Sequence, residues 1–185
     1  MTDAVCQNER RGVYPGSFDP PTIAHLAIAV MARRAANLDG VDLVVSRSAL
    51  AKEGLDHAPF DLRVQVIEAS IAHADWMRLV ITEAQLISDI AQGYDVVILG
   101  GDKWAQIVDP VFYDDENARD AAVAQLPQIV GPDRRGSDPL PDSATRLELP
   151  ARLQAVSSSA ARTTNPEFMT PPARKTAAAK GLWGL

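Results

Sequence analysis

The sequence contains one cysteine, Cys6, among its 185 residues. A single thiol forms neither an internal disulfide nor a cysteine-based metal cluster. Long apolar runs are missing too, since no stretch approaches the roughly 20 residues that span a bilayer. The first residues, MTDAVCQNERR, contain no apolar segment typical of a signal peptide. We therefore expect a cytoplasmic protein that does not enter membranes.

Positive charge is also in short supply. The chain has 18 Lys and Arg against 24 Asp and Glu, which gives a formal net charge of −6 at pH 7. A nucleic-acid or anionic-membrane surface needs a broad basic face, so the composition argues against both kinds of partner. A small anionic substrate is still compatible with this charge, because a local site can be positive on an acidic protein.

The remaining composition is that of an ordinary globular protein, with 46% hydrophobic and 23% charged residues. A chain of this length buries a sizeable core without disulfides or metals. We expect residues 11–185 to form one domain after a flexible N-terminus at 1–10. The sequence leaves open whether the protein forms homo-oligomers.

Strand-like and helix-like segments alternate along the chain, and runs such as VDLVVS are typical of buried parallel strands. The predicted strands are 11–16, 41–46, 77–82, 94–99, 127–131, 145–150 and 153–156. The predicted helices are 25–38 with Leu26, Val30, Met31 and Leu38 facing inward, 60–73, 83–92, 103–108, 116–126 and a terminal helix in PPARKTAAAKGLWGL. This order predicts an α/β fold with a Rossmann-like parallel sheet, helices on both faces and three layers. Such sheets bind ligands beyond the carboxyl ends of their strands.

The segment GVYPGSFDPPTIAHLAIA, residues 12–29, joins the first predicted strand to the first predicted helix. Gly16 allows a ligand close to the backbone, and two prolines stiffen the turn. Free amides at a helix N-terminus favour bound phosphate, and Thr22 and His25 would point from the first turn toward the same anion. The alternative is a proline-rich turn with a solvent-facing histidine. The segment is neither GxGxxG nor a P-loop.

Within it, GSFDPPTIAH resembles the signature of the cytidylyltransferase-like nucleotidyltransferase superfamily, which has the (H/T)xGH phosphate-binding motif. Members include nicotinate and nicotinamide mononucleotide adenylyltransferases, phosphopantetheine adenylyltransferases and cytidylyltransferases. Residues 16–20 match the Gly-x-Phe-Asp-Pro of the superfamily. Thr22, Ala24 and His25 match (H/T)xGH, with alanine where the motif has glycine.

A second superfamily signature, near the C-terminus, matches VSSSAAR. Taken alone, these letters are typical of a serine that caps a helix. The resemblance implies that Ser157, Ser158 and Ser159 hold the β and γ phosphates of a nucleotide and that Arg162 supplies a forked cation. Both signatures in the expected order are more specific than either one.

A third segment, LGGDKW, resembles the Gly-x-Asp segment of the pyridine-nucleotide adenylyltransferases. The resemblance implies that Gly100 and Asp102 contact the adenosine of ATP. The alternative is that Asp102 caps the helix that follows. Because phosphopantetheine adenylyltransferases lack this segment, it favours a nicotinate or nicotinamide mononucleotide as the acceptor.

Three residues are candidates for binding the acceptor. Lys52 lies where superfamily members often have a phosphate-contacting lysine, although a solvated surface lysine is the alternative. Arg63 matches a common arginine, or pairs with an acidic neighbour on its helix. Trp104 could stack on a planar ring or belong to the core.

The resemblance implies transfer of AMP from ATP to the phosphate of the mononucleotide, with release of pyrophosphate, in NAD biosynthesis. His25 would be a hydrogen-bond donor rather than a general base. Thr22 and Ser17 would assist near the α-phosphate, within an ATP-binding loop that includes Gly16 and Phe18. Mg²⁺ would bind mostly through phosphates and water, because the histidines show no metal-ligand spacing.

Two other functions stay open. YPGSFDPPT, SSS and LISDIAQ are closer to the phosphopantetheine branch, and the pyridine-binding segment of bacterial nicotinate enzymes is missing, so the acceptor could be phosphopantetheine or the nucleotide CTP. A non-catalytic nucleotide-binding homologue is the other alternative, and Ala24 supports it.

Overall fold

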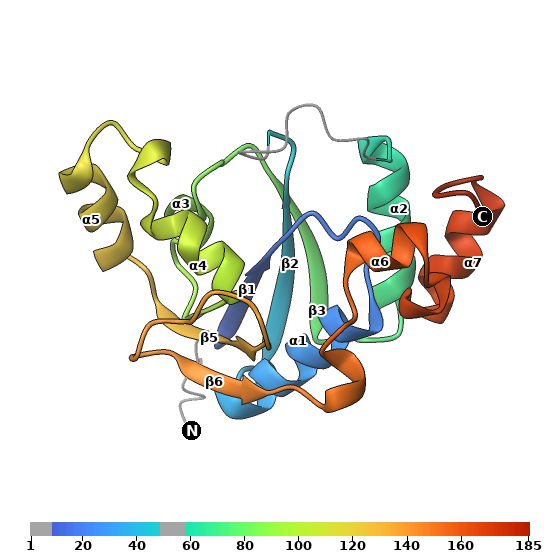
Figure 1. The fold of residues 1–185 in the computed structure, drawn as a ribbon, viewed down its shortest axis with the longest axis horizontal. Coiled ribbons are helices and arrows are strands. Elements are labelled where there is room, and N and C mark those ends of the chain that lie inside the picture. The colour runs from blue at the N-terminus through green and yellow to red at the C-terminus, as the bar shows by residue number, and fades with distance from the viewer. Residues whose placement is uncertain (1–8, 49–57) are drawn as a thin grey trace, which may run out of the picture.

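The computed structural model describes residues 9–48 and 58–185, through which runs a six-stranded parallel sheet of order β3-β2-β1-β4-β5-β6 (Figure 1). The strands are β1 (Arg11–Pro15), β2 (Gly40–Ser46), β3 (Met77–Thr82), β4 (Val96–Ile98), β5 (Gln128–Asp133) and β6 (Thr145–Glu148). The strand order changes direction at β1, which lies between β2 and β4. Because ligands of open parallel sheets bind at this switch point, the loop after β1 is the first place to look for a site.

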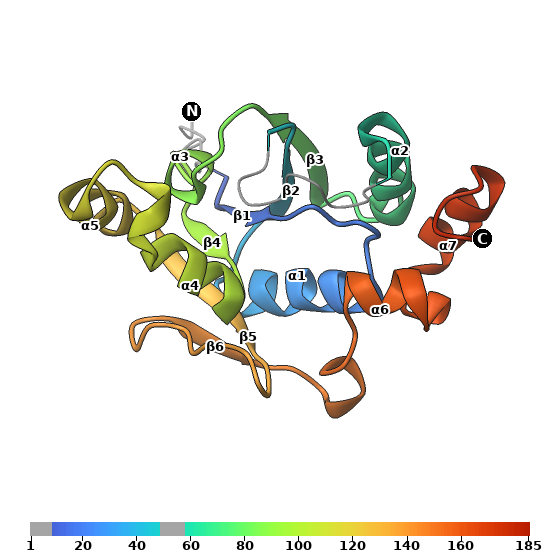
Figure 2. The ribbon, with the colours of Figure 1, turned by 45° about the horizontal axis from the view of Figure 1, so that its top comes forward.

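Helices cover both faces of the sheet, which confirms the predicted Rossmann-like fold with three layers (Figure 2). The helices are α1 (Ile23–Ala35), α2 (Phe60–Ile71), α3 (Ile87–Ile90), α4 (Gly101–Val108), α5 (Glu116–Ala124), α6 (Ser158–Thr163) and α7 (Pro171–Ala179), with short 3₁₀ turns η1 (Pro110–Phe112), η2 (Ala151–Leu153) and η3 (Pro166–Phe168). Successive strand residues point to opposite faces. Leu43 and Val45 of β2 pack in the core that includes α1 and α2, and Val44 packs in the core with α3 and α4.

The buried face of α1 differs from the prediction. Its buried residues are Ala24, Ile28, Ala29 and Ala32, instead of the stripe through Leu26, Val30 and Met31. Small alanines let the helix approach the sheet closely, and the larger side chains then pack at the margin of the core. Ala24 is fully buried, so a small residue is required where the superfamily motif has glycine.

Two predicted elements are wrong in extent or type. The helix predicted at 83–92 is a single turn, α3, and the strand predicted at 153–156 is not formed. There the chain enters the 3₁₀ turn η2 directly after β6, and this turn leads to the start of α6. Because β6 runs parallel to β5, it already ends at the carboxyl edge of the sheet, and the chain reaches α6 from there without a further strand.

The C-terminal segment packs beside α2, away from α4 (Figure 1). Leu182 joins Val66 of α2, Ala161 of α6 and Ala173 of α7 in a small core of their own. Thr170 donates a hydrogen bond to Ser70 Oγ at 3.0 Å, which ties α7 to α2. Among the described residues, no helix is long and apolar enough to cross a membrane.

Candidate active site

The hydroxyl and imidazole three residues apart form a reciprocal cap at the start of α1. The Thr22 backbone N–H donates to His25 Nδ1 at 3.0 Å, and the His25 N–H donates to Thr22 Oγ1 at 3.4 Å. Because Nδ1 accepts this bond, a neutral imidazole carries its proton on Nε2. Nε2 has no hydrogen-bond partner among the described residues, so His25 offers one oriented donor.

The imidazole of His25 packs against two aromatic rings, which also contact each other. Phe18 and Tyr14 both meet it edge-on, with ring centroids 5.1 and 6.1 Å away. Burial and, as the smaller cause, the positive charge of Arg134 together lower the pKa of His25 to about 4. At neutral pH the ring is therefore uncharged and can donate a hydrogen bond from Nε2.

The loop between β1 and α1 folds tightly on itself. Phe18 has a φ of 44°, in the left-handed region, and its side chain is buried. A Cβ on Gly16 would lie 3.0 Å from the Phe18 ring, so glycine makes room for that ring. The Gly16 N–H pairs with the Val44 carbonyl at 3.0 Å. The tight loop therefore places the buried Phe18 ring against the His25 imidazole.

Helix α6 packs against the loop between β1 and α1 and forms hydrogen bonds with its backbone (Figure 2). Ser158 Oγ donates to the Pro20 carbonyl at 2.8 Å, and the Arg162 guanidinium donates to the Asp19 carbonyl. Arg162 Nη1 also lies 3.7 Å from Asp19 Oδ2. The two sequence signatures are therefore in direct contact.

The serines of the second signature have different environments. Ser157 is the N-cap of α6, and its Oγ accepts from the Ala160 N–H at 3.1 Å. Ser158 is used in binding the loop, whereas Ser159 is exposed with Oγ 3.5 Å from Arg162 Nη2. Ser157 is exposed too, but its Oγ caps the helix, so Ser159 is the hydroxyl that is more available to a ligand.

The third segment that the sequence singled out, LGGDKW, forms the start of α4. Gly100 is the N-cap of α4 with no side-chain cap, so the alternative that Asp102 caps the helix is wrong. A Cβ on Gly100 would meet nothing within 4 Å, and Asp102 is exposed on the first turn. Trp104 is half-buried and packs against the core on this face of the sheet, which agrees with the alternative that it belongs to the core.

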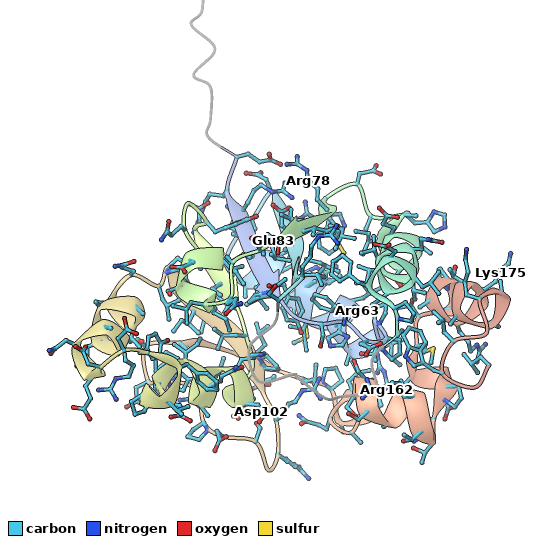
Figure 3. All side chains as sticks on the ribbon, turned by 90° about the horizontal axis from the view of Figure 1, so that it is seen from above. Arg63, Arg78, Glu83, Asp102, Arg162 and Lys175 are labelled. Carbon is cyan, nitrogen blue, oxygen red and sulfur yellow. The ribbon has the colours of Figure 1, made fainter. Side chains whose placement is uncertain are left out.

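A cavity of about 630 Å³ opens over the carboxyl ends of β1 and β2. Gly16 and Ser17 line it from the loop, Arg63 from α2 and Lys103 from α4. Figure 3 shows Arg63 and Arg162 on the side of α2 and α6, and Asp102 on the side of α4. The loop after β1 therefore has the cavity at one end and α6 at the other.

Arg63 is a buried cation in the wall of this cavity, with 7% of its surface exposed. Its guanidinium lies 5.3 Å from the Phe60 ring centroid, and Nε has no hydrogen-bond partner among the described residues. Burial lowers the pKa of Arg63, and the nearby Asp19 carboxylate opposes that change. A guanidinium in this setting is suited to an anionic ligand.

Residues 13–163 match the model of the family described as Cytidylyltransferase-like. The chain belongs to the cytidylyltransferase-like family. The match spans both signatures and most of the chain, so it confirms the resemblance and the prediction of a nucleotidyltransferase. No curated protein sequence gives a significant match.

Two solved structures share the fold of this cytidylyltransferase-like chain. Plasmodium falciparum nicotinic acid mononucleotide adenylyltransferase complexed with APC aligns with a TM-score of 0.68 at 15% identity, over 95% of this chain and 98% of that one. The same enzyme complexed with NaAD gives a TM-score of 0.68 at 13% identity, with the same coverage. At such identities the likeness establishes the fold.

Arg134 is the residue of this cytidylyltransferase-like site that the sequence did not reveal. It follows β5, its guanidinium donates to the Val156 carbonyl at 2.9 Å, and its charge acts on both His25 and Tyr14. Burial raises the pKa of the Tyr14 hydroxyl, and Arg134 opposes that change. The loop 132–144 has the composition of a surface turn, which hid this role. A basic pair directly after a strand was the available signal.

The remaining candidates concern the acceptor and metal. Lys52 lies outside the described residues. Among the residues that the structure describes, no three His, Cys, Asp or Glu side chains lie close enough to hold a metal ion. The donors around the loop are hydroxyls, amides and guanidinium groups, which bind phosphate rather than cations. This donor set fits a Mg²⁺ ion carried by nucleotide phosphates.

Proposed function

We propose that this protein transfers AMP from ATP to the phosphate of a nicotinate or nicotinamide mononucleotide, releasing pyrophosphate, as a step of NAD biosynthesis. The observation that carries the proposal is the position of the loop after β1. Gly16 and Ser17 line the cavity, and Asp19 and Pro20 bind α6. The His25 ring packs against Phe18 of the same loop and is not among the described residues that line the cavity, so the proposal places the α-phosphate beside the loop, at Nε2–H.

In the proposed reaction, an oxygen of the acceptor phosphate attacks the α-phosphorus of ATP. The bond from the α-phosphorus to the bridging oxygen breaks, and pyrophosphate leaves with the electron pair. A phosphate oxygen is already a competent nucleophile, so the protein contributes position and charge. His25 Nε2–H would donate to the α-phosphate, and Thr22 would fix the orientation of that ring through its cap. When bound, Mg²⁺ would neutralise phosphate charge.

Pyrophosphate would be held by α6 and the loop after β5. Arg162 is anchored on Asp19, and Arg134 is anchored on the Val156 carbonyl, just before α6. Anchored guanidinium groups lose little freedom when they bind phosphate, which is what preorganised stabilisation of developing charge requires. Ser159, whose hydroxyl is exposed and does not cap α6, would add a hydrogen-bond donor.

The cavity supports a mononucleotide as acceptor. Its volume of about 630 Å³ lies in the range of small-molecule sites. Phe60, Phe112 and Tyr113 supply aromatic surface along its walls, which suits a planar ring. Arg63 supplies a buried cation close to the loop, which suits the acceptor phosphate.

Phosphopantetheine as acceptor, or CTP as nucleotide, is the second candidate, favoured by YPGSFDPPT. Measuring pyrophosphate release decides among these functions. ATP and CTP would each be paired with nicotinate mononucleotide, nicotinamide mononucleotide and phosphopantetheine, with Mg²⁺ present. We expect release with ATP and a pyridine mononucleotide. Release with a different pair alone would move the function to that pair, and silence across the panel would favour a non-catalytic nucleotide-binding protein.

A further inference from the structure

Among the described residues that line the cavity beside the loop, the charged side chains are all cations. Arg47, Arg63 and Lys103 line it, and none of the described lining residues is Asp or Glu. The whole chain has a net charge of −6, so a lining of average composition would contain more carboxylates than cations. A local excess of cations against the net charge indicates a bound anion.

The two arginines account for one end of this cavity. Both guanidinium groups lie over the Phe60 ring, at 4.5 Å for Arg47 and 5.3 Å for Arg63. Arg47 Nε also lies 3.5 Å from Glu83 Oε1, and the negative charge of Asp19 raises the pKa of Arg63 against the effect of burial. Asp19 belongs to the loop after β1, so the Arg63 end is the end where phosphate transfer would occur.

Lys103 stands on the other wall. Figures 1 and 2 show α2 and α4 on opposite sides of the ends of β1 and β2. Lys103 Nζ donates to Gln106 Oε1 at 2.7 Å, one turn further along α4, and both residues line the cavity. The contact holds the ammonium against the cavity with a neutral partner. Among the described residues, no carboxylate oxygen lies within 4.0 Å of Nζ.

An ammonium in this position is incompletely stabilised. Burial lowers the pKa of Lys103, and the charge of Asp102 opposes the change only in part. The group has three donors, and one of them is used by Gln106. A partly desolvated cation with donors to spare gains free energy from an incoming anion.

We propose that Lys103 is a specificity-determining residue, which binds an anionic group on the acceptor at the end remote from its phosphate. This inference rests on the proposed function. The anion is a carboxylate on the ring of the acceptor, since a single ammonium suits a compact charge. Of the two pyridine mononucleotides, the carboxylate form is then the preferred substrate and the amide form the poorer one.

The test uses nicotinate and nicotinamide mononucleotides, which differ only in this group. We expect the protein to prefer the acid, and Lys103→Met to lower kcat/KM for the acid by about tenfold or more, the scale of one charge-assisted hydrogen bond. The loss should fall on KM, and kcat/KM for the amide should change less than about twofold. Lys103→Arg, which keeps the charge, should recover part of the preference.

Lys175→Met is the matched control, because Lys175 is exposed at the outer edge of α7 (Figure 3). It should leave kcat/KM for both compounds unchanged. Circular dichroism would establish that each variant is folded. An equal loss for acid and amide in Lys103→Met, or no loss for either, would overturn the role of Lys103 and leave the proposed function standing.

Binding measured by calorimetry without ATP separates the two proposals. If neither mononucleotide is turned over, the proposed function fails. The role of Lys103 would still be supported if the acid binds more tightly than the amide and Lys103→Met removes that difference. If the acid and amide bind equally well to the unaltered protein, the inference is wrong.

Discussion

Ser158 donates a hydrogen bond from Oγ to the backbone carbonyl of Pro20 at 2.8 Å, across 138 positions of sequence. Pro20 is buried, and its carbonyl belongs to the loop that positions His25. The bond therefore joins the two signatures through a side chain that the resemblance assigns to phosphate. Part of the second signature stabilises the first one, whatever ligand is bound.

Ser158→Ala should lower the free energy of unfolding by about 1–3 kcal/mol, because it leaves a buried carbonyl without its donor. Ser159→Ala is the control, since that hydroxyl is exposed, and it should change stability by less than about 0.5 kcal/mol. Urea unfolding measures both values. Equal effects of the two substitutions would show that the Ser158 contact contributes nothing.

His25→Ala should reduce turnover by at least about a hundredfold, the scale of losing one preorganised donor. It should also destabilise the protein by about 1 kcal/mol, because the reciprocal cap of α1 is broken. His73→Ala, at an exposed position after α2, should change neither quantity. Initial rates and thermal unfolding give the two readouts. Near-normal turnover in a folded His25→Ala protein would remove His25 from the mechanism.

Acid should weaken the fold through His25. Its pKa of about 4 lies below the ordinary value of 6.5, so between these values the unfolded chain binds a proton that the folded chain does not. Stability from this residue is therefore complete above about pH 6.5 and falls as the pH drops toward 4, by an amount on the order of 3 kcal/mol. His25→Gln should flatten this part of the curve. An unchanged slope in urea unfolding at pH 4–7 would contradict the assigned pKa shift.

Much of the fold followed from the sequence, because its signals are local. Runs of β-branched residues located the strands, and the alternation of strands and helices gave the layers. The α1 face was predicted wrongly because periodicity marks large apolar residues, whereas alanines form the contact with the sheet. The distance between a helix and a sheet is a tertiary property that no single window contains.

The site divides in the same way. The sequence singled out His25 and Thr22 because one turn of helix contains both, and the cap that they form is a local motif. Arg134 was missed because its neighbours in sequence are turn residues, and its charge acts on a ring 109 positions earlier through the approach of β5 to β1 by way of β4. The sequence suggested Trp104 as an acceptor-binding residue and did not single out Lys103. Only the fold shows that Lys103, and not its neighbour Trp104, lines the cavity.

Arg134→Gln should raise the pKa of His25, because it removes a positive charge that lowers it. Burial is the larger cause and is unaffected, so the pKa should stay below 6.5. Arg135→Gln is the matched control, since Arg135 is exposed and contacts Gln154 through its backbone. NMR titration of the His25 ring measures its pKa in the unaltered protein and in both variants. The same His25 pKa in both variants and the unaltered protein would exclude an electrostatic role for Arg134.

Gly100 and Gly101 offer adjacent glycines with opposite expectations. A Cβ on Gly101 would lie 1.6 Å from the Asp138 carbonyl oxygen, so Gly101→Ala must displace the backbone of the loop after β5. We expect a loss of about 1–3 kcal/mol of stability, typical of overpacking.

Gly100→Ala, in contrast, meets no atom within 4 Å and has a φ of −94°, which alanine adopts freely. Stability should be unchanged, while KM for ATP should rise because the added methyl occupies the space where the nucleotide is proposed to lie. Urea unfolding and initial rates at varied ATP separate the two effects. If Gly100→Ala left KM for ATP unchanged, the open surface above Gly100 would not be where the nucleotide binds, and the start of α4 would belong to the acceptor cavity alone.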